Sequence, residues 1–135
     1  MFGKRQNKPK NRIDSLVGAG VRIDGSISFS GGLRVDGEVN GNIIAVPGKP
    51  STLVLSEYAR VNGEISATHL VVNGVVDGPV HVAEYLELQG KARVKGNVHY
   101  KTLEIQLGAI VEGRLAHLAE VESNKVVALK LNSAD

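Results

Sequence analysis

The stretch ARVNGEI at residues 59–65 is one of several near copies of a single short pattern. Related stretches are VVDGPV at 75–80, ARVKGNV at 92–98 and AIVEGRL at 109–115. In each copy, two aliphatic residues flank a glycine at a distance of two positions. The full set of these glycine triplets is Ile23-Gly25-Ile27, Val39-Gly41-Ile43, Val61-Gly63-Ile65, Val76-Gly78-Val80, Val94-Gly96-Val98 and Val111-Gly113-Leu115. A pattern that recurs in this way predicts a repeat architecture.

The spacing of the triplets is nearly regular. Their glycines lie 16, 22, 15, 18 and 17 residues apart, and the long interval contains the turn-rich insertion VPGKPS at 46–51. A second aliphatic pattern runs in step with the first, at Leu33-Val35, Leu53-Leu55, Leu70-Val72, Leu86-Leu88 and Leu103-Ile105. Both patterns alternate apolar with polar residues, which indicates half-buried β-strands.

Strands that recur every 17 or 18 residues, with no amphipathic helical segment between them, favour an all-β solenoid over βαβ units. If each coil has three short faces, six coils stacked about 4.8 Å apart make a triangular rod roughly 3 nm long. The central glycine is expected where a coil turns a corner and leaves little room for a Cβ atom. An antiparallel sandwich with glycines in hairpin turns is the alternative fold, and the fixed period argues against it.

The composition is that of one folded domain, with 42% hydrophobic and 22% charged residues in a chain of 135. The absence of cysteine excludes disulfides and thiolate metal sites. No apolar run approaches the roughly 18 residues that span a bilayer, and the basic start does not resemble a secretory signal. We therefore expect a cytoplasmic protein.

Several phrases together carry a family resemblance. They are IDGSISFSGGLRVDGEVNGNI, RVNGEI, LVVNGVVDGPV, LELQGKARVKGNV and LEIQLGAIVEGRL, between about Val17 and Leu118, and they resemble the bactofilins. The resemblance implies a single-domain right-handed parallel β-helix between flexible tails, in a bacterial cytoskeletal protein that polymerises without nucleotide or another cofactor. It also implies a scaffold that supports cell shape or localises cell-wall synthesis proteins or peptidoglycan hydrolases. We expect a tail at 1–14, the β-helix core at 15–118 and a second tail at 119–135, with both tails disordered.

The two ends of the solenoid are candidate polymer interfaces, because neither boundary shows an amphipathic capping helix and an open end exposes unpaired strands. The candidates are Val21, Ile23 and Ile27 at the N-terminal end, and Leu103, Ile105, Leu107, Ile110, Val111 and Leu115 at the C-terminal end. Alternatively, each packs only inside its own coil. The resemblance implies filaments in which like ends meet. Many relatives carry an aromatic residue near the last coil, but residues 103–118 contain no Phe, Tyr or Trp.

The N-terminal segment MFGKRQNKPKNR is strongly basic and contains no acid. Residues 13–135 carry 11 Lys and Arg against 14 Asp and Glu. The candidate membrane-targeting residues are Met1, Phe2, Lys4, Arg5, Lys8, Lys10 and Arg12, with Phe2 inserting and the cations approaching anionic headgroups of the inner membrane. The Met1-Phe2-Gly3-Lys4 start also resembles the membrane-targeting segment of bactofilins. A solubilising arm and a nucleic-acid contact are the alternatives, and the acidic body with few aromatics argues against nucleic acid.

Residue types that carry chemistry form few clusters in this sequence. His81, His99 and His117 lie 18 residues apart, but the triplet register aligns only His81 with His99, so at most this pair would share a metal ion. No GxxxxGK[ST] phosphate loop is present, and neither nucleotide binding nor catalysis is expected. The enzymatic alternative is a hexapeptide acyltransferase, a left-handed trimer with coils of similar length, whose aliphatic residue at every sixth position is absent here.

Overall fold

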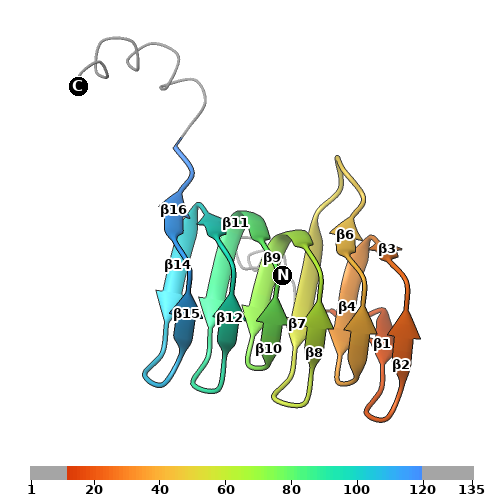
Figure 1. Cartoon of the computed structure of the whole chain (residues 1–135). Helices are drawn as coiled ribbons and strands as arrows, with labels where there is room; N and C mark the ends of the chain where they lie inside the picture. Colours follow the sequence, from red (N-terminus) through yellow and green to blue (C-terminus); the bar gives the residue numbers. More distant parts are fainter. Residues whose placement is uncertain (1–11, 120–135) are drawn as a thin grey trace, which may run out of the picture.

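The computed structural model describes residues 12–119, which form sixteen β-strands and no helix. Every strand pair among them is parallel. Successive strands lie on three faces of a solenoid of about six coils, seen from the side in Figure 1. The prediction of an all-β parallel solenoid is confirmed.

Each coil contributes one strand segment to each face. Face one contains β1 (Ser15–Val17), β4 (Gly31–Val35), β7 (Ser51–Leu55), the second parts of β9 (Ile65–Val72) and β11 (Val80–Leu88), and β14 (Thr102–Ile105). Face two contains β2 (Arg22–Asp24), β5 (Glu38–Asn40), β8 (Arg60–Asn62), β10 (Val75–Asp77), β12 (Arg93–Lys95) and β15 (Ile110–Glu112). Face three contains β3 (Ile27–Phe29), β6 (Ile43–Ala45), the first parts of β9 and β11, β13 (Val98–Tyr100) and β16 (Leu115–His117).

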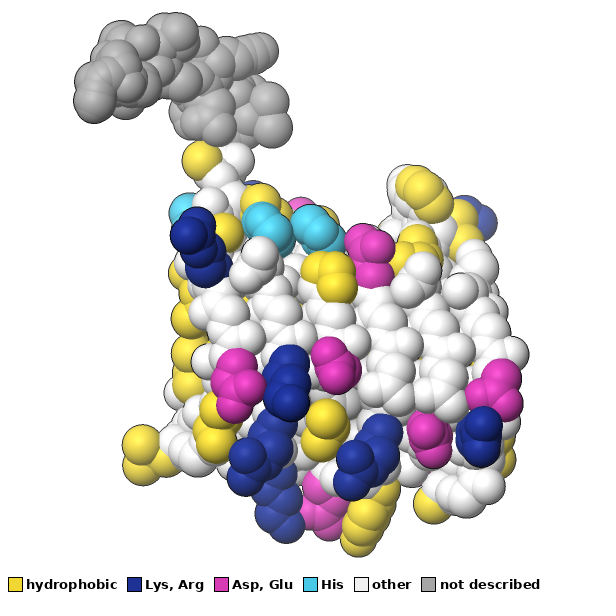
Figure 2. All heavy atoms as spheres, in the orientation of Figure 1, with side chains coloured by type: hydrophobic (Ala, Val, Ile, Leu, Met, Phe, Trp, Pro, Cys, Tyr) yellow, Lys and Arg dark blue, Asp and Glu magenta, His cyan; other side chains and the backbone are white. Residues whose placement is uncertain are grey.

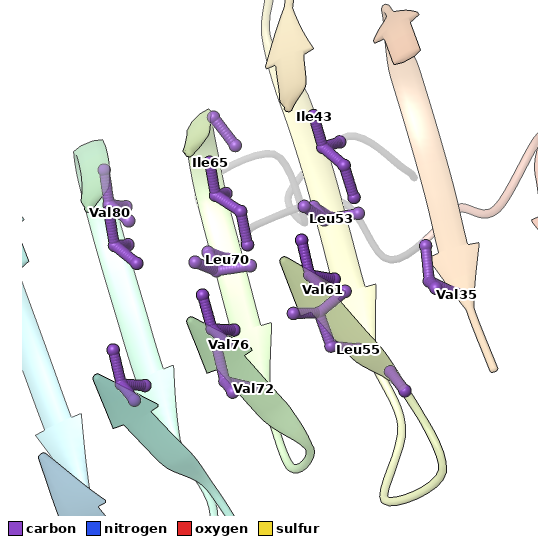
Figure 3. Close-up of a cluster of buried hydrophobic side chains, with 14 of the residues drawn as sticks. Val35, Ile43, Leu53, Leu55, Val61, Ile65, Leu70, Val72, Val76 and Val80 are labelled. Atoms are coloured by element: carbon purple, nitrogen blue, oxygen red, sulfur yellow. The ribbon is translucent and has the colours of Figure 1, made fainter. Parts of the chain in front are cut away.

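The strand register stacks equivalent aliphatic residues into columns that fill the interior. On face two, for example, Val39, Val61, Val76 and Val94 follow one another in register and are each at most 1% exposed. Leucines and valines of face one and isoleucines and valines of face three complete the core from the other two sides (Figure 3). Each coil therefore buries its apolar residues against the coils before and after it, as the alternating pattern predicts.

Three corners connect the faces. The turn corner joins face one to face two, the glycine corner joins face two to face three and carries the triplet glycines, and the loop corner joins face three to face one of the next coil. The insertion at 46–50 lies at the loop corner, between β6 and β7, and projects from the rod in Figure 1. The extra residues therefore leave the strand register undisturbed.

The triplet glycines stack directly on one another at the glycine corner. A Cβ atom built on Gly78 would lie 2.2 Å from the carbonyl oxygen of Gly63, and one on Gly63 would lie 2.2 Å from that of Gly41. Both glycines also have φ near +155°, a conformation that L side chains rarely adopt. Gly25, in the first coil, has φ +141°, but no atom lies within 4 Å of the place where its Cβ atom would be. The expected lack of room for Cβ is thus confirmed, and it is caused by the backbone of the preceding coil.

We expect Gly78→Ala to destabilise the fold far more than Gly25→Ala. Both substitutions introduce backbone strain of about 1–3 kcal/mol. Only Gly78→Ala also forces a methyl group into the neighbouring backbone, which adds roughly 1–3 kcal/mol. Urea unfolding of the unassembled proteins, followed by circular dichroism, measures both losses. Equal losses at the two positions would contradict the stacked-glycine explanation.

Candidate assembly surfaces at the two ends of the solenoid

The first coil leaves the N-terminal end of the apolar interior partly uncovered. Ile23 and Ile27 begin columns whose next members, Val39 and Ile43, are fully buried, yet both are themselves only half-buried. Val21 lies in the turn before β2 and is 46% exposed. The three predicted N-terminal residues therefore lie in one coil, and two of them occupy open column ends.

The last coil exposes more apolar surface than the first. Leu103, Ile105, Val111 and Leu115 end inward columns in register with Leu86, Leu88, Val94 and Val98. Each of those four partners is at most 1% exposed, whereas Ile105 is 48% and Leu115 is 42% exposed. Figure 2 shows hydrophobic side chains gathered along the left-hand edge, where β14, β15 and β16 end the rod.

Two predicted C-terminal residues lie beside this surface. Ile110 pairs with Arg93 and therefore belongs to the outward column of face two. Leu107 lies in the turn between β14 and β15 and is almost fully exposed. The structure thus brings Leu103, Ile105, Val111 and Leu115 together at the open end, with Ile110 and Leu107 at its border.

Several residues at the ends are not apparent from the aliphatic patterns alone. Val17 and Phe29 are buried in the first coil, where Ser15 takes the column position that Leu33 holds in the second. Counting back one period from Val35 leads to Val17, so the repeat itself locates this residue. At the other end, the ring of His117 packs edge-on against Tyr100, with centroids 5.6 Å apart. The last coil therefore ends in a ring side chain although it has no Phe, Tyr or Trp.

The histidine register is the one expected from the triplets. His81 pairs with His99, and their rings stack with centroids 4.5 Å apart and an interplanar angle of 7°. The Nδ1 atom of His99 is buried and has no hydrogen-bond partner among the described residues. Within residues 12–119, no group of three or more His, Asp or Glu residues is placed to hold a metal ion. The stacked pair lies on face three, in the fourth and fifth coils.

The titratable groups with shifted pKa lie on the sides of the rod. A hydrogen bond from Asn40 lowers the pKa of Asp24, and a hydrogen bond from Lys91 lowers that of Glu57. The hydrogen bond that the Tyr85 hydroxyl donates to Glu104 raises the pKa of Tyr85 to about 12. The largest cause of each shift is a hydrogen bond with one neighbouring side chain on the outside of the rod, so none of these groups points to a catalytic cavity.

The predicted membrane-targeting residues lie outside the described residues, except Arg12. Two residues after Arg12, Asp14 forms two hydrogen bonds with Gly32. The Asp14 amide donates to the Gly32 carbonyl at 2.9 Å, and the Gly32 amide donates to the Asp14 carboxylate at 2.9 Å. Asp14, the last residue of the predicted tail, is thus hydrogen-bonded to the second coil.

Comparison with known proteins agrees with this geometry. A family model described as Bactofilin, polymer-forming cytoskeletal, matches residues 15–116, a span that runs from β1 into β16. Searches of the curated proteins and of the solved structures returned no match. The family match covers most of the chain and all six coils, and it confirms the resemblance seen in the repeated phrases. The chain belongs to the bactofilin family of polymer-forming cytoskeletal proteins.

Proposed function

We propose that the protein is a membrane-associated scaffold that polymerises end to end, without nucleotide, through the terminal coils of its solenoid. The observation that carries the proposal is the exposure of inward aliphatic columns at both ends, while the same columns are fully buried in between. Its role would be structural rather than catalytic, in supporting cell shape or localising cell-wall synthesis proteins or peptidoglycan hydrolases at the inner face of the cytoplasmic membrane.

The physical basis is that a joint between rods completes the packing that each end lacks. Full burial of an aliphatic side chain contributes roughly 1.5–3 kcal/mol, and the residues at the open C-terminal end have gained only part of it. A joint also pairs the free edges of three terminal strands, whose backbone groups have no neighbouring coil. Within residues 12–119 no helix covers either end of the solenoid.

We expect Leu115→Arg to shorten the filaments and to raise the protein concentration needed for assembly roughly tenfold or more, because it places an unpaired charge in a dry contact. Leu115 is 42% exposed in the single rod, so the substitution is compatible with folding. Sedimentation and negative-stain electron microscopy without nucleotide measure the effect.

Thr102→Arg is the matched control. Thr102 lies in the same coil, but it pairs with Tyr85 on the outward side of face one and is exposed. This variant should assemble like the unaltered protein. Normal filaments from Leu115→Arg would exclude the proposed C-terminal interface, and equal defects in both variants would argue for lateral contacts instead.

We further propose that the basic N-terminal segment attaches the filament to an anionic membrane. Within the described residues, no helix is long and apolar enough to cross a bilayer. Phe2 and the cations of residues 1–12 would supply a contact at the membrane surface. Each cation contributes at most about 1 kcal/mol, so one copy binds weakly. A filament presents many copies, and the resulting avidity couples assembly to membrane binding.

Phe2→Glu should abolish most of the co-sedimentation with anionic liposomes, because it removes the inserting side chain and adds a like charge to the membrane surface. Filament formation in the absence of lipid should be unchanged, which electron microscopy of the same preparation checks. Equal liposome binding by the unaltered and the Phe2→Glu proteins would contradict insertion of Phe2.

A further inference from the structure

The N-terminal segment meets the solenoid at its side. An outward Cβ atom built on Gly32 would lie 1.8 Å from the carbonyl oxygen of Arg12, so this segment passes over the outer surface of β4. The guanidinium of Arg12 is held 3.1 Å from the carboxylate of Asp14. Arg12 also lines a surface recess together with Pro50 and His69, which belong to the third and fourth coils. The basic segment therefore joins the rod on its flank, at the loop corner.

The insertion loop Val46–Pro50 lies beside this point. Its first residue is fixed by a hydrogen bond from the Val46 amide to the Phe29 carbonyl, at 2.8 Å. The residue that follows the loop, Ser51, is buried, and its hydroxyl accepts a hydrogen bond from the Thr68 amide at 2.9 Å. Between these anchors the loop is exposed, and Val46 is 37% exposed. The loop therefore presents Val46, two prolines and Lys49 to solvent, and hydrogen bonds hold the chain at both of its ends.

The loop corner is also the most positive of the three corners among the described residues. It carries Arg12, Lys49 and Lys101 against Asp14 and Glu84. The turn corner carries Lys91 against Asp36 and Glu57, and the glycine corner carries Arg114 against Glu64. Lys49 forms no ion pair with a described carboxylate.

Face two is the rival basic surface, but its charges balance. It carries Arg22, Arg60, Arg93 and Lys95 against Asp24, Glu38, Asp77 and Glu112. In Figure 2 the charged side chains lie mainly over the lower half of the visible surface, where several Lys and Arg side chains adjoin one another with Asp and Glu at their borders, whereas the loop projects at the upper right with hydrophobic side chains. An anionic surface is therefore attracted to the loop corner more than to face two.

We propose that the loop corner is the side of the rod that lies on an anionic lipid bilayer. In this orientation the loop at 46–50 enters the headgroup region next to Arg12, where the basic segment joins the rod. The proposal rests on the membrane attachment proposed above and adds the orientation of the rod. With the loop corner against the bilayer, the rod lies along the membrane plane, so both open ends stay free for assembly and face two, which lies opposite this corner, remains accessible to protein partners.

The chain contains no tryptophan, so a single introduced tryptophan reports on one position without background. We would compare Val46→Trp with Tyr58→Trp at the turn corner, where Tyr58 is 68% exposed. With phosphatidylglycerol-containing vesicles whose acyl chains are brominated, the emission of Val46→Trp should fall by roughly half. That of Tyr58→Trp should fall by less than roughly a tenth.

A charge reversal provides the second measurement. Lys49→Glu should reduce vesicle co-sedimentation roughly fivefold or more at low salt. Lys95→Glu, an equal change of charge on face two, should leave it nearly unchanged. Electron microscopy should show normal filaments for both variants.

The outcomes separate the two proposals. If the unaltered chain does not sediment with vesicles, membrane attachment itself is wrong and the orientation falls with it. If the unaltered chain sediments, the orientation is overturned by quenching of neither reporter, by equal quenching of both, or by equal binding of the Lys49→Glu and Lys95→Glu proteins. In those cases attachment by the N-terminal segment still stands.

Discussion

The structure depends on one backbone contact that recurs between each coil and the next. At the glycine corner, the carbonyl group of one triplet glycine occupies the space where a side chain of the next would begin. This contact lets successive coils approach to the spacing at which parallel strands form hydrogen bonds on all three faces. A side chain there would hold two coils apart and open the ladders on either side. The regular glycine and the closed aliphatic columns are thus consequences of the same requirement.

A structure of nearly identical layers has no internal reason to stop growing. Each coil is stabilised by the coils before and after it, and the first and last coils lack one of these neighbours. In a globular protein such edges are usually covered, but here the described residues end with half-exposed aliphatics at both ends. The property that builds the monomer, stacking of flat layers, is also the one that would build the filament. In the proposed end-to-end assembly, the joint between rods therefore requires neither a nucleotide nor a separate interaction domain.

Most of the fold follows from the sequence because one pattern repeats in register. The triplets locate the glycine corner, the Leu-x-Leu pairs locate face one, and the register correctly pairs His81 with His99 but not with His117. Residues that depart from the repeated pattern are harder to place from the sequence. Ile110 appears equivalent to the inward aliphatics, but it lies one residue out of phase and faces outward. The contact of Asp14 with Gly32 joins residues 18 positions apart through main-chain groups and one carboxylate, and the aliphatic periodicity carries no trace of it.

The central claim is that the axis of the solenoid is also the axis of the filament. Diffraction from aligned filaments, or the power spectrum of filament images, tests it directly. If rods join end to end, the strand spacing of about 4.8 Å runs parallel to the filament axis, with one rod for each 29 Å or so of length. A 4.8 Å spacing perpendicular to the filament axis would show that the rods associate side by side, and it would contradict the account.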